Sequence, residues 1–483
     1  MRNMLLLHST VIGASTAMLG GALAQTSTSS PAPAQKQIIQ VEAAASGANS
    51  NNNYQAATLP GGVKNPTPGT MVVRLNGRVW SEIGLGGGSG YQSGTFKANP
   101  YSIGTFVRLF PGVDAMATNG LRYGAQAEIR ENFRAISTGS NTTAGSSNNA
   151  VATTGQTGGS PLTCGQTLYV RRAFVYLSGA DWGLVRMGQT DSVTGIFDNG
   201  ITTGQQVGEG LWNGDAPGWV GGAGSVTFPW LSQQGADYGT NKIVYLSPQF
   251  SGFDFGIDWA ANNGNQEGGG YTASSGDPQL SSSAVLGDGA RFTNMYKIGA
   301  RYQGTVGPVA LYAFGAYIGS GHVAYTGASP IPVVAGATYN GKFSNLSAGF
   351  VGAEFTYAGF SIGGAWQGGK YNEAMALAPL NGVGANAWLI NVLWTSGPYT
   401  VGATYYQLDD QGAVSLAGIS QQHQDAFGVG ANYQVSPGLR YFFEYLYGQK
   451  HQGNFNYLTG TAGSTLGNNA HTQAFMIGTQ VGW

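Results

Sequence analysis

Five arginines fall on one face of three segments in which apolar and polar residues alternate. Arg74 and Arg78 share a face in VRLNGRVW, and Arg130 and Arg134 share one in LRYGAQAEIRENFRA. Arg108 belongs to the alternating segment between these two. Side chains of an extended strand alternate between its two faces, so neighbouring strands would gather these five arginines into a basic wall. Guanidinium groups stay charged and bind anionic or dipolar groups, but they supply no nucleophile.

Acidic residues gather elsewhere, in the polar stretch 190–239, which contains Asp191, Asp198 and Asp215. This stretch has no alternating run and is therefore predicted to be a long connection between strands. It also carries four aromatic residues that can pack it against the basic wall: Trp212, Trp219, Phe228 and Trp230. The sequence thus predicts a basic wall with an acidic connection beside it.

Residues that could carry catalysis or hold a metal are scarce. A nucleophile needs a base within hydrogen-bond reach, yet few histidines follow the first 24 residues: His322, His423, His451 and His471. The one cysteine, Cys164, permits no paired-cysteine metal site. The stretch GLGGGSG lacks the strand–turn–helix setting of a dinucleotide-binding loop. We therefore expect no enzyme activity, no cofactor and no metal.

Composition narrows the class of protein. Charged residues make up 9% of the chain, against about 25% in soluble globular proteins, while 80 glycines and 12% aromatic residues are high. Beyond the N-terminus there is no run of the roughly 20 apolar residues that a transmembrane helix needs. These features, with a mean hydropathy of -0.09, are typical of a transmembrane β-barrel, although a secreted glycine-rich chain competes. A net charge of -1 argues against nucleic acid as a partner.

The N-terminus predicts export. Residues 1–24 combine one basic residue, a short apolar stretch and a final Ala-Leu-Ala, as in a cleaved signal peptide. Residues 25–70 are rich in proline, alanine, serine, asparagine and glycine, which predicts a flexible periplasmic tail. Residues 71–483 are left to form the β-barrel domain.

Alternation beyond Met71 predicts sixteen antiparallel strands, so the expected fold class is all-β. The predicted strands are 72–84, 99–110, 121–134, 166–179, 182–189, 240–248, 251–262, 292–304, 307–319, 344–357, 358–370, 386–396, 397–409, 422–435, 437–449 and 470–483. Every second connection is short, and the others are long and rich in glycine, asparagine and serine. Short turns at one end and long loops at the other are typical of outer-membrane barrels.

Two hairpins carry a resemblance to a known family. The segments RRAFVYLSGADWGLVRMGQTDS and NKIVYLSPQFSGFDFGIDWA resemble the corresponding hairpins of the sixteen-stranded, trimeric general porins of Gram-negative outer membranes. The last strand, AFMIGTQVGW, is similar to the C-terminal insertion signal of such proteins, although it ends on Trp483 where Phe is commoner. The resemblance covers residues 71–483.

The resemblance implies a passive diffusion channel for small hydrophilic solutes and ions. In that family the third external loop, here 190–239, folds into the lumen, and wall arginines face its acids across a constriction. Carried to this chain, the basic side is Arg74, Arg78, Arg108, Arg130 and Arg134, and the acidic side is Asp191, Asp198 and Asp215. The resemblance also implies an outer-membrane location, contact with membrane lipid and a homotrimer.

One position departs from the family pattern. Gln189 stands where the family often has arginine, so one member of the basic wall is missing. Arg171, Arg172 and Arg186 lie close by in the sequence, and alternation leaves open which face each occupies.

Two other functions stay open at this point. A channel specific for a sugar or an anion would line its lumen with aromatic or densely basic side chains. A barrel-anchored surface or adhesive protein would bind partners through its long loops and would need no open lumen.

Overall fold

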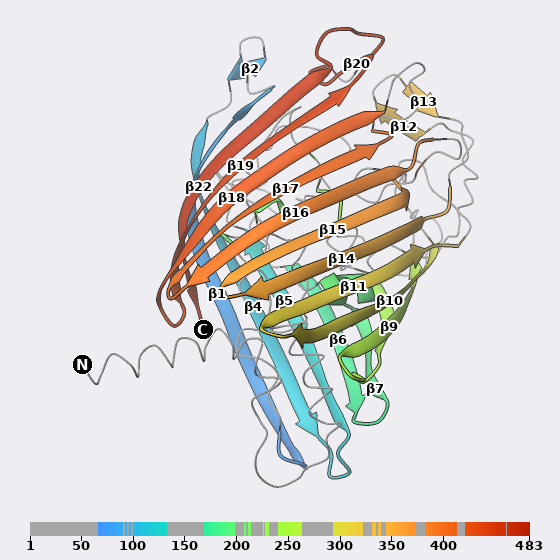
Figure 1. Ribbon diagram of the computed structural model, residues 1–483, viewed down its shortest axis with the longest axis vertical. Helices are drawn as coiled ribbons and strands as arrows, with labels where there is room; N and C mark the ends of the chain where they lie inside the picture. The colour runs from blue at the N-terminus through green and yellow to red at the C-terminus, as the bar shows by residue number, and fades with distance from the viewer. Residues whose placement is uncertain are drawn as a thin grey trace, which may run out of the picture.

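Sixteen strands close into one antiparallel barrel (Figure 1). The computed structural model describes residues 66–89, 92–93, 96–97, 100–132, 169–198, 207–208, 211–213, 226, 228–230, 240–262, 293–321, 331–334, 337–339, 344–372, 378, 382–412, 421–459 and 461–483. The predicted signal peptide, Cys164 and nearly all of the predicted tail lie outside these residues. The barrel closes where the first strand pairs with the last, with Ile83 opposite Ile477.

Each predicted strand corresponds to one barrel strand, so the predicted fold class is confirmed. The strands are β1 (Thr70–Gly88), β4 (Tyr101–Met116), β5 (Arg122–Asn132), β6 (Tyr169–Gly179), β7 (Gly183–Gln189), β8 (Asn241–Leu246), β9 (Phe253–Asn262), β10 (Thr293–Val306), β11 (Val309–Gly319), β14 (Ser347–Tyr357), β15 (Phe360–Lys370), β16 (Ala385–Ser396), β17 (Tyr399–Asp410), β18 (Gln422–Ser436), β19 (Leu439–Gln452) and β22 (Asn469–Gly482). In the described parts of the long connections lie three small hairpins: β2 (Gln92–Ser93) with β3 (Phe96–Lys97), β12 (Ile331–Val334) with β13 (Ala337–Tyr339), and β20 (Phe455–Asn456) with β21 (Thr461–Ala462).

Alternation sorts apolar residues to the outer face of the wall. In β16, Trp388, Ile390 and Val392 are exposed outward, whereas Leu389 and Asn391 are buried inward. Aromatic pairs lie on the outer face near the short turns, as in Phe360 with Trp394 and Tyr399 with Tyr433. Aromatic side chains at this level suit the interface between hydrocarbon and water.

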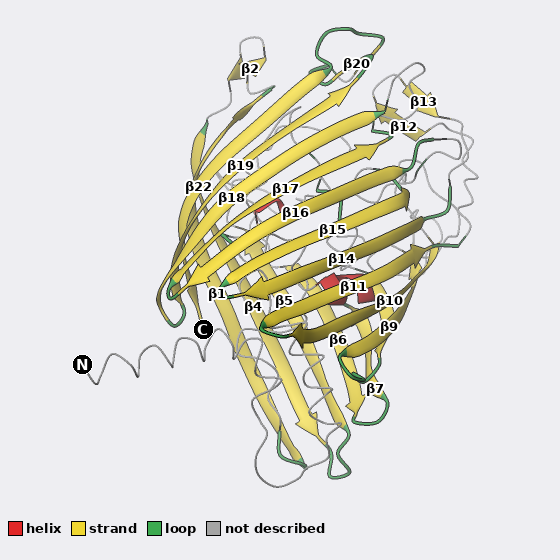
Figure 2. Ribbon diagram, viewed as in Figure 1, coloured by secondary structure: helices red, strands yellow, loops and turns green. Residues whose placement is uncertain are grey.

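Among the described residues of the long connection between β7 and β8 are two short helical segments (Figure 2). The segment α3 (Val193–Asp198) contacts β9, β10 and β11, and η2 (Leu211–Asn213) contacts β18 and β19. Their apolar side chains join one buried hydrophobic cluster with inward-facing residues of β14, β16 and β17. In the described part of the chain no helix has the length and apolar character needed to cross a membrane.

Candidate functional site

Arg78, Arg108 and Arg130 form a row across β1, β4 and β5, which we term the arginine row. Arg78 is the direct cross-strand partner of Arg108, and Arg108 is the partner of Arg130. All three side chains point inward and are at least nine-tenths buried. Like charges directly opposite each other on neighbouring strands are destabilising. Sheet stability therefore does not account for this row.

Trp80 offsets part of the repulsion within the row. The guanidinium carbon of Arg78 lies 4.8 Å from the Trp80 ring centroid, and that of Arg108 lies 4.7 Å from it. Trp80 is stacked on Phe106, with centroids 4.9 Å apart and planes 11° apart. Each cation–π contact contributes about 0.5–2 kcal/mol. The aromatic pair thus helps to hold two neighbouring guanidinium groups in place.

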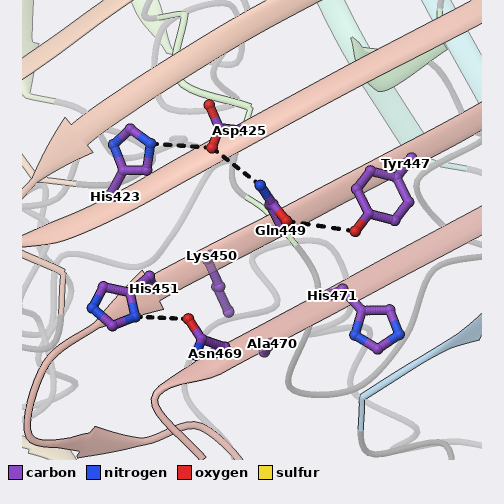
Figure 3. A pocket seen from close by; sticks show the side chains of 9 residues that line it. All are labelled: His423, Asp425, Tyr447, Gln449, Lys450, His451, Asn469, Ala470 and His471. Carbon is purple, nitrogen blue, oxygen red and sulfur yellow. Dashed lines mark hydrogen bonds and ion pairs between the residues drawn. The ribbon is translucent and has the colours of Figure 1, made fainter.

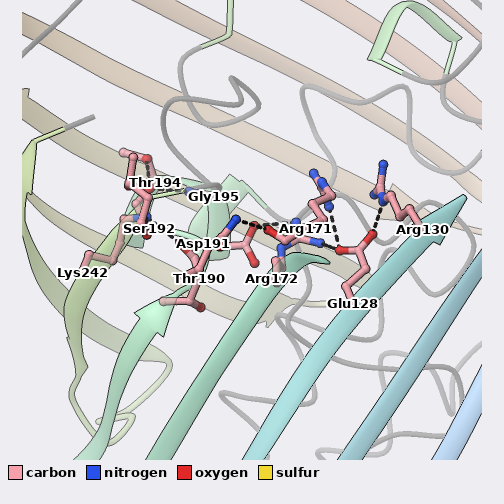
Figure 4. A network of polar contacts seen from close by, with 12 residues as sticks. Glu128, Arg130, Arg171, Arg172, Thr190, Asp191, Ser192, Thr194, Gly195 and Lys242 are labelled. Atoms are coloured by element: carbon pink, nitrogen blue, oxygen red, sulfur yellow. Dashed lines mark hydrogen bonds and ion pairs between the residues drawn. The ribbon is translucent and has the colours of Figure 1, made fainter. Parts of the chain in front are cut away.

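Glu128 is the counter-charge beside the row (Figure 4). Its Oε1 accepts a hydrogen bond from Arg130 Nε. Its Oε2 accepts one from Arg171 Nη1 at 2.9 Å and another from Arg172 Nη1. Arg172 Nη2 also donates to Asp191 Oδ1 at 2.6 Å. One glutamate therefore serves three arginines, and the third links the network to the start of the connection 190–239.

A β-bulge decides the facing of Arg171 and Arg172, which alternation left open. Glu128 pairs with Arg172 and Ile129 pairs with Val170, so Arg171 is an extra residue in β6. Because a bulge adds one residue to a strand without a partner, both arginines point inward, and both are buried.

Arg186 points inward from β7, and Gln189 is the buried last residue of that strand, paired with Ala173 and Asn241. Arg186 is buried and lies over the Phe174 ring, 5.1 Å from its centroid. Gln189 Nε2 donates to the backbone oxygen of Arg171 at 2.8 Å. Position 189 thus carries no charge, and the bulge places Arg171 and Arg172 close to it on the inner wall.

Arg74 stands apart from the arginine row. Its Nε lies 2.6 Å from Asp114 Oδ2, and the Tyr176 hydroxyl donates to Asp114 Oδ1. Four residues along a strand span about 13 Å, which separates Arg74 from Arg78. Arg134 and Asp215 lie outside the described residues.

The two described acids of the connection are not brought together. Asp191 pairs with Arg172 on the row's side of the barrel, and burial raises the pKa of its carboxyl while Arg172 acts to lower it. Asp198 ends α3, where the preceding residue, Phe197, accepts a hydrogen bond from the Tyr312 hydroxyl of β11. Asp198 therefore lies beside β11 on another part of the wall.

Comparison with known proteins decides what this barrel is. A family model described as Gram-negative porin matches residues 22–453. The chain belongs to the Gram-negative porin family. A closed sixteen-stranded barrel of this family lies in the outer membrane and forms a channel.

Solved structures similar to this porin have low sequence identity to it. An anion-selective porin from Comamonas acidovorans aligns with a TM-score of 0.50 and 15% identity, covering 86% of this chain and 100% of that one. The trimer form of OmpT, an outer membrane protein of Vibrio cholerae, aligns with a TM-score of 0.47 and 13% identity, covering 86% and 99%. No curated protein matches this porin in sequence.

Contacts at two walls hold the connection 190–239 of this porin. Near α3, the Val193 amide donates to Asp258 Oδ2 of β9 at 2.8 Å. Further along, Gly208 N donates to Asn432 Oδ1, and Gly208 O accepts from Arg440 Nη1, each at 2.9 Å. Sequence reasoning gave Asp258 and Arg440 no such role. The available signal was a charged residue at an inward-facing position of a strand.

The aromatic residues of the connection pack against a different wall from the one predicted. Trp212 and Phe228 lie edge-on to Tyr406 of β17, with centroids 6.2 and 5.9 Å apart. Trp230 lies 6.0 Å from Phe350 of β14. The prediction that they pack on the basic wall was wrong, because the inner faces of β14–β19 supply the larger apolar surface. Trp219 lies outside the described residues.

A separate polar pocket of about 230 Å³ lies at the ends of β18, β19 and β22 that adjoin long connections (Figure 3). The His423 ring lies between two carboxylates, with Nδ1 2.6 Å from Asp409 Oδ1 and Nε2 3.1 Å from Asp425 Oδ2. Within the described ranges no group of three or more His, Cys, Asp or Glu side chains could hold a metal ion. This pocket is not part of the arginine row.

Proposed function

We propose that this porin is a passive diffusion channel for small hydrophilic solutes and ions that prefers anions. The observation that carries the proposal is the charge balance around the arginine row. Five guanidinium groups gather there with two carboxylates: Arg78, Arg108, Arg130, Arg171 and Arg172 with Glu128 and Asp191. The local excess of positive charge attracts anions and repels cations, as charged rings do in other pores.

The buried hydrophobic cluster between the connection and the wall indicates where solutes cannot pass, and so favours a passage beside the arginine row. Side chains of the connection, including Ile196, Trp212 and Trp230, pack with inward residues of β14, β16 and β17. Water and ions avoid such a surface. An otherwise open barrel of sixteen strands would leave a wide aqueous channel. We infer that solutes pass between this packed side and the arginine row, within reach of its field.

The predicted constriction residues take different parts in this proposal. Arg78, Arg108 and Arg130 form the basic side of the proposed passage. Asp198 lies beside β11, on another part of the wall, and takes no part in the arginine row. Arg74 and Asp191 are held in ion pairs with Asp114 and Arg172. Arg134 and Asp215 keep the same expected roles on sequence grounds alone.

Assembly and export are further parts of the proposal. We propose that residues 1–24 are removed on export and that the mature chain forms a homotrimer, as the family resemblance implies. The exposed apolar outer face would contact membrane lipid and neighbouring subunits. Native mass spectrometry of the purified protein tests the assembly, since a monomer alone would reject the trimer.

Single-channel recording tests whether the barrel conducts. The purified, refolded mature chain in a planar bilayer should give discrete steps of current. A folded barrel that gives no current would reject the channel and favour the barrel-anchored surface protein.

A further inference from the structure

Val207 of the connection lies across two glycines of the wall. Gly402 of β17 and Gly430 of β18 are direct cross-strand partners. Val207 Cγ2 lies 2.6 Å from the position that a Cβ at residue 402 would take, and Cγ1 lies 2.5 Å from the corresponding position at residue 430. Real Cβ contacts are not shorter than 3.0 Å. Glycine at both positions therefore makes the hollow that Val207 fills.

Two more inward-facing glycines continue this surface. A Cβ at Gly428 would lie 3.4 Å from Leu211 Cδ1, and one at Gly448 would lie 2.7 Å from Val226 Cγ2. We define Gly402, Gly428, Gly430 and Gly448 as the glycine seat. Glycine weakens a strand interior and marks places where another part of a chain approaches closely. Four apolar side chains of the connection lie against these positions: Val207, Leu211, Trp212 and Val226.

Polar contacts fix the connection in one position on the seat. Gly208 is held from both sides by Asn432 and Arg440, and the Trp212 indole donates to the backbone oxygen of Phe427 at 2.9 Å. Gly208 has a φ of +59°, and a Cβ there would collide with the Glu444 side chain. Only glycine satisfies both requirements. These contacts define the position of the segment in the wild-type protein, and a displacement of the segment would strain them together.

We propose that the glycine seat sets the width of the passage, because it determines how far the connection stands from the arginine row. This inference rests on the proposed channel function and names further residues that govern it. A bulkier residue in the seat pushes the connection towards the row and narrows the passage. A smaller residue at Val207 makes room for that bulk.

A size exchange between the two partners tests the proposal. Gly402→Ala should lower single-channel conductance, and adding Val207→Ala should restore it towards the wild-type level. Gly349→Ala is the matched control, because residue 349 lies on the outer face of β14, where a Cβ would make only an ordinary 3.6 Å contact with Trp366. Unchanged conductance in Gly402→Ala, or a fall that Val207→Ala does not reverse, overturns the proposal.

A cross-link tests the seat without relying on conduction. In a Cys164→Ser background, Val207→Cys with Gly430→Cys should form a disulfide, since bridged Cβ atoms lie about 3.8 Å apart. Val207→Cys with Ala365→Cys on β15 is the control and should stay reduced. If the wild-type protein does not conduct but the first pair cross-links, the proposed function fails and the seat stands. If the first pair does not cross-link, the connection does not occupy the seat.

Discussion

Arg78 and Arg108 are direct cross-strand partners, and both guanidinium groups lie against the ring of Trp80. Trp80 in turn is stacked on Phe106. Two guanidinium groups side by side repel each other. The aromatic pair and Glu128 offset this repulsion in different ways, one through ring contacts and one through charge. The chain therefore maintains a costly concentration of positive charge at one level of the inner wall, which is what an anion-preferring channel requires.

Removing one charge from the arginine row should weaken anion preference. In Arg108→Gln we expect the ratio of chloride to potassium permeability to fall, because the local positive excess is smaller. Lys370→Gln is the matched control, since it removes one positive charge from the exposed end of β15, away from the row. Reversal potentials of both variants provide the measurement, and equal shifts would contradict a special role for the row.

Glu128→Gln should change selectivity in the opposite direction and also lower stability. The carboxylate accepts hydrogen bonds from Arg130, Arg171 and Arg172. The substitution therefore removes one negative charge that three buried guanidinium groups share. Breaking a buried ion pair costs about 3–5 kcal/mol. We expect a lower urea midpoint together with stronger anion preference. A midpoint equal to that of the wild type would show that Glu128 does not hold the cluster together.

Asp191 should make anion preference depend on pH. Burial raises the pKa of its carboxyl, so it takes up a proton at a higher pH than an exposed aspartate does. As the pH falls from neutral towards 3.8, the ordinary aspartate value, the negative charge beside Arg172 is lost and anion preference should rise. For stability, a native pKa above the unfolded one makes this group destabilising at neutral pH, and that cost declines as the pH falls.

Asp191→Asn provides the comparison for this pH effect. Its permeability ratio at neutral pH should resemble that of the wild type at lower pH, and its remaining pH dependence should be smaller. An identical pH profile in both proteins would mean that Asp191 does not titrate in this range.

The ion pair between Arg301 and Asp254 should stabilise the docking of α3. Arg301 donates to Asp254 from Nε at 2.7 Å and from Nη2 at 2.8 Å, and its guanidinium carbon lies 4.6 Å from the Phe197 ring centroid. Asp254→Asn alone should lower the free energy of unfolding by about 3–5 kcal/mol, whereas Asp254→Asn with Arg301→Gln should lose less. Urea titration of the wild type, Asp254→Asn, Arg301→Gln and the double variant is the measurement. Additive losses would contradict direct coupling.

The sixteen strands could be predicted because each must present apolar residues to lipid along its whole length. A shift of one residue would turn that face inward, so alternation fixes both the strand and its facing. The β-bulge at Arg171 breaks this rule locally. Alternation cannot show whether Arg171 or Arg172 points inward when the true answer is both.

The arrangement of the site was less accessible from the sequence. That Arg78, Arg108 and Arg130 share one row depends on the register of two strand pairs, and a strand prediction does not fix register. The sequence also assigned the connection's aromatic residues to the wrong wall. Two successive inward positions of β18, Gly428 and Gly430, carry no side chain. This pattern in the sequence could have indicated that the connection packs closely against β18.

The reversal potential of the wild-type channel under a salt gradient tests the central claim most directly. With potassium chloride at unequal concentrations across a planar bilayer, we expect a reversal potential of the sign that shows chloride to be more permeant than potassium. The same experiment on Arg78→Gln with Arg108→Gln should move that potential towards zero. A wild-type potential of the cation-selective sign would contradict the account, because the arginine row would then not control what passes.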